Sequence, residues 1–204
     1  YQPDFVIVDP SILKSLSLRQ IKTGYAEIIK HSLINDKKFF QWLKINNKKI
    51  LMKEKNILFY AITKSIKIKA KYVMKDEKEK LINSSSRAML NFGHTFGHAL
   101  EVINNYSTKL THGEAISIGM VIAANISHKL NNLTKNELSD ITNHFKNAGL
   151  PYTTKKVIRN KLYKIITSDK KNTNNKINLI LLKTIGSAYF KRGLNITKIK
   201  KLIN

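Results

Sequence analysis

The sequence contains no cysteine, and only three prolines and eight glycines among its 204 residues. The lack of cysteine excludes both a disulfide framework and a metal site built from thiolates. The glycines are scattered, so the chain has no GxGxxG motif or other glycine-rich loop for a nucleotide phosphate. No run of 18 apolar residues occurs either, and we therefore expect no transmembrane helix and no membrane partner.

Acidic residues are also scarce, since 13 Asp and Glu stand against 37 Lys and Arg and give a formal net charge of +24. Such a charge is compatible with a basic module that binds nucleic acid. However, only four of these residues are arginine, and the lysines are spread through every segment. Because arginine is favoured for reading nucleic acid, we expect no specific nucleic-acid partner and a general attraction for anionic substrates.

The N-terminal segment, YQPDFVIVDP, lacks the basic and apolar regions of a signal peptide and resembles the interior of a longer protein. Phe5–Val8 predicts a short strand with no obvious sheet to join. After it, apolar spacing predicts helices from SLRQIKTGYAEIIKHSLI onward, with long segments at about 48–76, 87–104, 113–130, 135–148 and 155–167. KINLILLKTIGSAYFKRG predicts a hairpin with a turn near Gly186, followed by a short Lys-rich helix. The sequence thus predicts a mainly α-helical domain.

Residues 84–101, SSSRAMLNFGHTFGHALE, combine an apolar helical pattern with several polar residues. Successive helical residues turn by about 100°, which places these polar residues in one narrow stripe. The stripe consists of Arg87, Asn91, His94, His98 and Glu101. Unpaired buried polar groups cost roughly 1–3 kcal/mol each. We therefore expect the stripe to face a cavity that holds a metal, an anion or water.

Two further stretches carry polar residues with candidate roles. In THGEAISIGM, Thr111 and Glu114 match a capping box, so a helix should begin at or next to His112. In GYAEIIKH, Glu27 shares a helix face with Lys30 in an apolar neighbourhood. Taken alone, the first pattern is typical of an ordinary helix cap and the second of a surface ion pair.

Together, the three stretches predict a metal site. One carboxylate and one histidine from each of two helices make a His₂Glu set, which is typical of catalytic zinc because three protein ligands leave one position open. Alternatively, His94 and His98 could form a pair of their own, although residue 95 is threonine and the HExxH motif is absent. Several side chains are donors that suit a substrate with phosphate and carboxylate groups: Lys30, Lys69, Arg87, Asn91, and Lys170 or Lys171.

Four motifs resemble, in the same order, those of the 3-dehydroquinate synthase family: AEIIKH, RAMLNFGHTFGHALE, HGEAISIGM and DKK. The resemblance runs from PDFVIVDP to about LLKTIG. It implies the helical C-terminal domain of that fold at 19–204, and the last strand and linker of a nucleotide-binding domain at 1–18. It also implies that a metal, zinc or cobalt, is held by Glu27, His94 and His112.

The resemblance further implies the conversion of 3-deoxy-D-arabino-heptulosonate 7-phosphate to 3-dehydroquinate and phosphate, a step of the shikimate pathway to aromatic amino acids. Family members use NAD to oxidise and later reduce a ring hydroxyl, so a chain without the nucleotide-binding domain should be inactive. The implied substrate contacts are Lys30, Lys69, Arg87, Asn91, His98, and Lys170 or Lys171. A related sugar-phosphate cyclase is the alternative. We expect a cytoplasmic homodimer that acts on a small anionic sugar phosphate.

Overall fold

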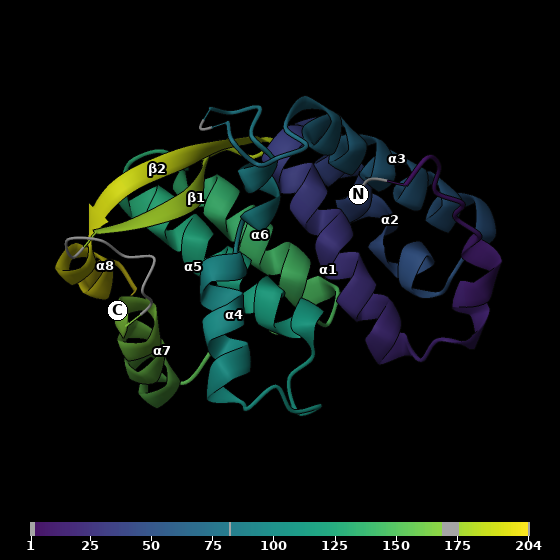
Figure 1. Ribbon diagram of the computed structural model, residues 1–204. Coiled ribbons are helices and arrows are strands. Elements are labelled where there is room, and N and C mark those ends of the chain that lie inside the picture. The colour runs from purple at the N-terminus through teal and green to yellow at the C-terminus, as the bar shows by residue number, and fades with distance from the viewer. Residues whose placement is uncertain (1–2, 82, 169–175, 204) are drawn as a thin grey trace.

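The computed structural model describes residues 3–81, 83–168 and 176–203, which form a helical domain with one β-hairpin (Figure 1). Two of its elements, η1 and η2, are short 3-10 helices. In chain order the elements are η1 (Pro10–Ser15), α1 (Leu18–Asn35), α2 (Lys37–Leu51), α3 (Lys55–Lys75), η2 (Arg87–Asn91), α4 (His94–Ile103), α5 (His112–Lys129), α6 (Lys135–Asn147), α7 (Lys156–Ser168), β1 (Lys176–Thr184), β2 (Ser187–Asn195) and α8 (Ile196–Ile203).

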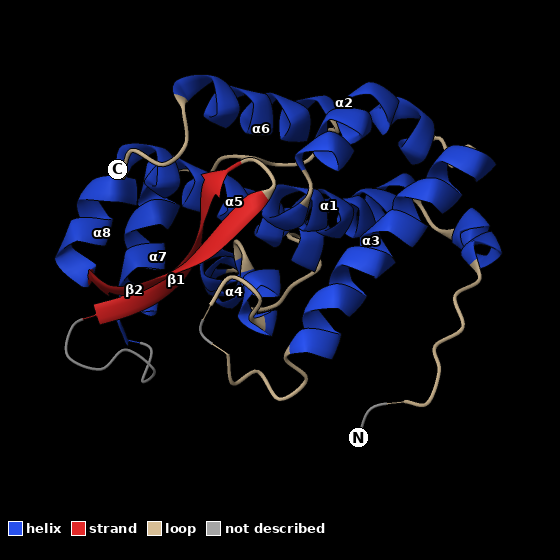
Figure 2. Cartoon of the chain, turned by 90° about the horizontal axis from the view of Figure 1, so that it is seen from above, coloured by secondary structure: helices blue, strands red, loops and turns tan. Residues whose placement is uncertain are grey.

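Helix α5 is the centre of the fold, and its side chains between Gly113 and Ser127 are buried on almost every face. Helices α1, α4, α6 and α8 pack around it together with strand β1 (Figure 1). Helices α2 and α3 then pack on α1 (Figure 2). Helices α1 and α5 therefore form the centre of the fold, and α7 is attached to it through α4 and α8. Within the described ranges, no helix has both the length and the apolar character needed to cross a membrane.

Two segments that apolar spacing predicts as single helices are each divided in the structure. The segment 48–76 contains the end of α2 and all of α3, separated by a turn in which Lys53 has a φ of 59°. The segment 87–104 is divided because Gly93 adopts a φ of +82° between η2 and α4. The prediction of one continuous polar stripe is therefore wrong, since only its members from His94 onward share a regular helix. The segments predicted for α5, α6 and α7 are confirmed.

The predicted hairpin is confirmed, because β1 and β2 pair antiparallel. Gly186 lies in the turn with a φ of +86°, a conformation that glycine adopts without steric cost. Its amide donates a hydrogen bond of 2.8 Å to the carbonyl of Leu33. This bond ties the hairpin turn to the end of α1. The predicted Lys-rich helix follows as α8.

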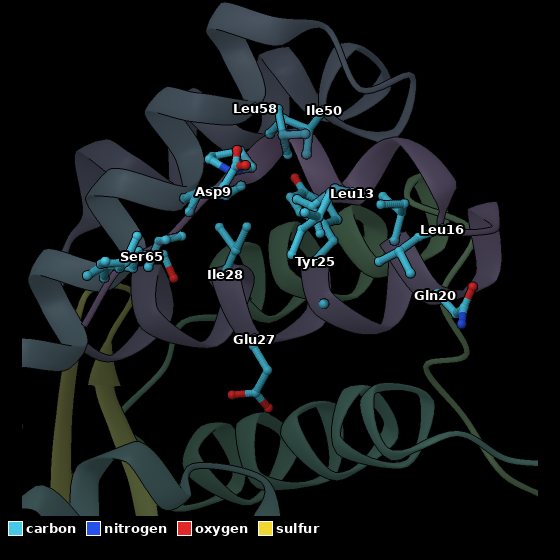
Figure 3. Close-up of a pocket in the computed structure, with 18 residues that line it drawn as sticks. Asp9, Leu13, Leu16, Gln20, Tyr25, Glu27, Ile28, Ile50, Leu58 and Ser65 are labelled. Atoms are coloured by element: carbon cyan, nitrogen blue, oxygen red, sulfur yellow. The ribbon is translucent and has the colours of Figure 1, made fainter. Parts of the chain in front are cut away.

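The strand predicted at Phe5–Val8 is not formed. The segment is irregular and its apolar side chains are exposed, Phe5 by 78% and Ile7 by 83%. A strand requires a neighbouring strand for its hydrogen bonds, and in the described ranges β1 and β2 pair only with each other. From Ile7 to Pro10 the segment borders a mainly apolar cavity of about 410 Å³, which is also lined by α1 and α3 (Figure 3).

Candidate metal centre

Three helices bring one potential metal ligand each to the same place. Glu27 lies in the middle of α1, His94 is the first residue of α4, and His112 is the first residue of α5. One ligand atom from each of these side chains lies within 4.8 Å of the other two. The structure therefore assembles the three residues that the sequence predicts as metal ligands, although they are separated by up to 85 positions in the chain.

Glycines allow α4 and α5 to approach closely enough to bring the two histidines together. A Cβ on Gly119 of α5 would overlap the carbonyl oxygen of Gly93 and lie 2.8 Å from the amide nitrogen of Gly97. A Cβ on Gly97 would in turn lie 2.5 Å from the side chain of Ile116. At Gly97 the Ile116 side chain could move aside, but at Gly119 the close contacts are with backbone atoms, so a larger residue there would force the two helices apart.

The N-terminus of α5 is also fastened to α1, the helix that carries Glu27. Gly113 packs directly on the backbone of Thr23, where a Cβ would overlap the carbonyl oxygen. The hydroxyls of Thr23 and Thr111 are 2.8 Å apart. Arg19 donates two hydrogen bonds, of 2.8 and 2.7 Å, to the carboxylate of Glu114. Glu114 and Thr111 form the predicted capping box, which is confirmed. His112 is thereby held at a defined place beside α1.

The carboxylate of Glu27 has one engaged and one unengaged oxygen. Its Oε2 accepts a 2.5 Å hydrogen bond from Lys30, whose side chain is only 4% exposed, so the pair is not the ordinary surface pair that the segment alone suggests. Its Oε1 is buried and has no hydrogen-bond partner. Figure 3 shows the carboxylate pointing away from the apolar cavity. A buried carboxylate oxygen without a partner is costly, and a metal ion would satisfy it.

Burial and neighbouring charges act in opposite directions on Glu27. Burial raises its pKa, but the nearby Lys30 ammonium and its hydrogen bond outweigh this and hold the pKa below the usual 4.5. Burial also lowers the pKa of Lys30, against the attraction of Glu27. The carboxylate is therefore ionised at neutral pH, as a metal ligand must be.

Each of the two histidines has an acceptor oxygen beside its Nδ1. Burial, followed by the positive charge of Lys30, lowers the pKa of His94 to about 4, so its imidazole is neutral. His94 Nδ1 lies 3.3 Å from the carbonyl of Phe92, and His112 Nδ1 lies 3.0 Å from a carboxylate oxygen of Glu101. Because both oxygens accept, each Nδ1 donates, which leaves Nε2 as the ring nitrogen available to a metal. The residues thus fit a divalent ion.

Other predicted site residues lie beside this cluster. His98, one turn after His94, is exposed, with its ring centroid 5.2 Å from that of His94 and 6.0 Å from that of His112. Lys69 is exposed on α3, near enough for its charge to contribute to the low pKa of Lys30. The cluster of Glu27, His94 and His112, called here the metal-type cluster, therefore has an exposed imidazole and cationic side chains beside it. Lys170 and Lys171 lie outside the described residues.

Arg87 and Asn91 are held by the loop that precedes η2. Arg87 donates a 3.0 Å hydrogen bond to the backbone carbonyl of Glu77, and Asn91 donates one of 3.2 Å to the carboxylate of Glu79. The same loop is organised by buried Asp76, which accepts from the backbone amides of Lys80, Leu81 and Arg87. The structure thus places Arg87 and Asn91 in a loop network instead of on a common helical stripe with His94.

Two acidic residues of this region are not assigned as metal ligands or substrate contacts in the sequence-based prediction. Asp76 gives no sequence signal beyond an acidic residue next to a polar loop. Glu101 does give one, because it lies on the polar side of the apolar helix, seven residues after His94. Together with His98 and His112, Glu101 forms a second group whose ligand atoms lie within 4.8 Å of one another.

Comparisons with known proteins show which family the chain is similar to. The family model described as "3-dehydroquinate synthase C-terminal" matches residues 24–172, which include Glu27, His94 and His112. The 3-dehydroquinate synthase of Thermodesulfovibrio yellowstonii is 42% identical, over 100% of this chain and 56% of that protein. The enzyme of Pelagibacter ubique is 44% identical, over 96% of this chain and 53% of that protein.

Solved structures of two synthases share the fold of this chain. A 2-epi-5-epi-valiolone synthase from Streptomyces hygroscopicus, solved with NAD⁺ and Zn²⁺ bound, superposes with a TM-score of 0.82 at 21% identity and covers 96% of this chain and 53% of its own. A 2-deoxy-scyllo-inosose synthase, solved with carbaglucose-6-phosphate, NAD⁺ and Co²⁺, superposes with a TM-score of 0.75 at 25% identity. The match covers 100% of this chain and 57% of that protein.

The chain spans about half the length of the curated relatives it matches. The family match nevertheless covers most of the chain and contains the metal-type cluster, the capping box and the glycines that join α4 to α5. The chain therefore belongs to the 3-dehydroquinate synthase family, whose C-terminal domain it contains.

Proposed function

We propose that this chain is the metal- and substrate-binding part of a 3-dehydroquinate synthase. The proposed reaction converts 3-deoxy-D-arabino-heptulosonate 7-phosphate to 3-dehydroquinate and phosphate. The observation that carries the proposal is the cluster of Glu27, His94 and His112, in which Glu27 keeps a buried oxygen without a partner. The family match and relatives of more than 40% identity support the same reaction.

The ligands of the proposed metal are one Glu27 oxygen and the Nε2 atoms of His94 and His112. This donor set suits Zn²⁺ or Co²⁺ and leaves a coordination position open. When bound, the ion would act as a Lewis acid toward a substrate hydroxyl. The reported presence of Zn²⁺ or Co²⁺ in the two cyclase structures supports the choice of metal.

The remaining residues would bind and orient the anionic substrate. Lys30 and Lys69 supply positive charge beside the cluster, which suits phosphate and carboxylate groups. The exposed imidazole of His98 would hold or relay a proton at a substrate hydroxyl. We retain Arg87, Asn91, and Lys170 or Lys171 as proposed contacts. For Arg87 and Asn91, substrate binding would require exchange of their present hydrogen bonds to Glu77 and Glu79.

NAD does not fit this chain, which has no glycine-rich phosphate loop. We propose that NAD is bound by another part of the complete protein, and that residues 1–18 connect that part to the helical domain at 19–204. The exposed apolar side chains of Phe5, Val6 and Ile7 support this role, because such side chains are normally covered in an assembled protein. The cytoplasmic homodimer expected from the sequence remains a prediction.

A related sugar-phosphate cyclase is the second candidate, favoured by the fold shared with 2-deoxy-scyllo-inosose synthase. The test is a substrate panel on the full-length protein with NAD and Zn²⁺. We expect phosphate release from 3-deoxy-D-arabino-heptulosonate 7-phosphate and none from glucose 6-phosphate, which lacks a carboxylate. Glu27→Gln and His94→Ala should abolish both phosphate release and stoichiometric zinc. The reverse substrate preference would favour the second candidate, and retained zinc in both variants would contradict the metal centre.

A further inference from the structure

We propose that Glu101 is the positioning residue of the metal ligand His112, an inference that rests on the proposed metal centre. Glu101 lies in the last turns of α4, whereas His112 begins α5. The Glu101 side chain is only 14% exposed, and its Oε1 lies 3.0 Å from Nδ1 of His112. The two helices that carry the histidine ligands are therefore joined by a carboxylate–imidazole contact directly beside the site.

His112 needs such a partner more than His94 does. His94 is half-buried between its neighbours, but the His112 side chain is 46% exposed at the end of a helix. Among the described residues, Glu101 is the one hydrogen-bond partner of the His112 ring. Without it, the ring could rotate about χ1 and χ2 and either nitrogen could carry the proton. The contact with Glu101 selects the tautomer protonated at Nδ1.

The selected tautomer directs the other nitrogen into the site. His112 Nε2 lies 3.9 Å from the unengaged Oε1 of Glu27, so both atoms can reach one ion. His94 has the equivalent arrangement, with the Phe92 carbonyl as its acceptor. Glu101 differs from that carbonyl in carrying a negative charge, which increases the basicity of the imidazole toward a metal. Loss of such a partner typically weakens metal binding by about 10–100-fold.

A competing role for Glu101 is direct coordination, because Glu101, His98 and His112 form the second cluster of possible ligands. Direct coordination would use the Glu101 oxygen and could use the same Nδ1 that now takes part in the hydrogen bond. The two roles differ in their dependence on His98. A positioning Glu101 acts without His98, whereas a metal bound in the second cluster requires it.

The test measures the zinc affinity of the 204-residue chain by competition with a chromophoric chelator. The variants are Glu101→Ala, Glu101→Gln and His98→Ala, and circular dichroism checks that each is folded. We expect Glu101→Ala to weaken zinc binding by about 10–100-fold at a stoichiometry of one. Glu101→Gln keeps an oxygen acceptor but not the charge and should recover part of the affinity. His98→Ala should stay within about threefold of the parent, since its ring lies outside the proposed ligand set.

The visible spectrum of the Co²⁺-loaded chain gives a second readout, which a merely structural role would not change. Glu101→Gln should shift the ligand-field bands because the donor strength of His112 changes. Unchanged affinity and spectrum in Glu101→Ala would overturn the positioning role. Equal loss of metal in His98→Ala would overturn it in favour of direct coordination. If the parent binds no zinc, or if Glu27→Gln and His94→Ala bind it normally, the metal centre itself fails and the inference falls with it.

Discussion

Gly119 in α5 lies against the backbone of Gly93 at the start of α4, with no room for a side chain between them. This contact sets the separation of the two helices one residue away from His94. The position of His94 therefore depends on a glycine in another helix, 25 positions later in the sequence. The same principle applies to Gly113, which lets His112 approach α1.

Gly119→Ala tests this dependence. The added methyl group would overlap the carbonyl oxygen of Gly93, so α4 and α5 must separate. We expect the free energy of unfolding to fall by about 1–3 kcal/mol, as for other overpacked cores. Zinc affinity should fall as well, because the ligands move apart. Urea denaturation and chelator competition measure the two effects.

The matched control is Gly24→Ala in α1, where the added Cβ meets no heavy atom within 4 Å. Alanine is favoured over glycine in helices, so this variant should gain about 0.5–1 kcal/mol and bind zinc normally. If Gly119→Ala and Gly24→Ala change stability and zinc affinity equally, Gly119 is not needed for the close approach of α4 and α5.

Lys30→Met should lower the stability of the metal-free chain and raise its affinity for metal. The substitution leaves the Glu27 carboxylate without its cation, and we expect the metal-free chain to lose about 2 kcal/mol, less than a fully buried pair would cost. The removal of a positive charge beside the ligands should also strengthen zinc binding. Thermal unfolding is measured with EDTA and with zinc. The rise in unfolding temperature caused by zinc should be larger in the variant than in the parent. A smaller zinc-induced shift would contradict this account.

Acid should destabilise the metal-free chain through its buried histidines. Burial lowers the pKa values of His31, His94 and His144 to about 4, compared with 6.5 in the unfolded chain. The unfolded state therefore binds protons first, and stability is lost as the pH falls from about 6.5 toward 4. For His144, which contacts Tyr25 in the core, the loss between pH 7.5 and pH 5 is about 2 kcal/mol.

Guanidinium denaturation at the two pH values, in EDTA, checks this prediction. His144→Gln should reduce the pH-dependent loss by about 2 kcal/mol, because glutamine does not titrate in this range. An equal loss in the parent and in His144→Gln would show that the proton is taken up elsewhere.

The 204-residue chain alone should not release phosphate from the proposed substrate, even with Zn²⁺ and NAD present. The physical reason is the absence of a glycine-rich loop that could hold the dinucleotide. A coupled phosphate assay is sufficient for the measurement. Phosphate release that rises in proportion to the chain concentration, and that Glu27→Gln abolishes, would show that the chain is sufficient for turnover.

Local chemistry made much of the molecule predictable from its sequence. The capping box at Thr111 and Glu114 depends on residues three positions apart, so the start of α5 and the place of His112 follow directly. The hairpin turn at Gly186 follows from a glycine between two apolar runs. The residue types Glu27, His94 and His112 likewise indicate a metal, because their donor atoms suit one wherever they meet.

Features that depend on contacts between residues remote in the chain were decided by the tertiary structure alone. Gly93 interrupts the predicted long helix with a positive φ, and it packs so closely against Gly119 and Met120 of α5 that a side chain would not fit there. The segment 5–8 has the composition of a strand but pairs with no strand among the described residues, so it stays irregular and exposed. The contact between Glu101 and His112 requires α4 and α5 to meet at one angle and distance. The sequence determined which groups could bind a metal, whereas the packing of glycine-lined helices decided that they meet, because only packing sets distances between residues remote in the chain.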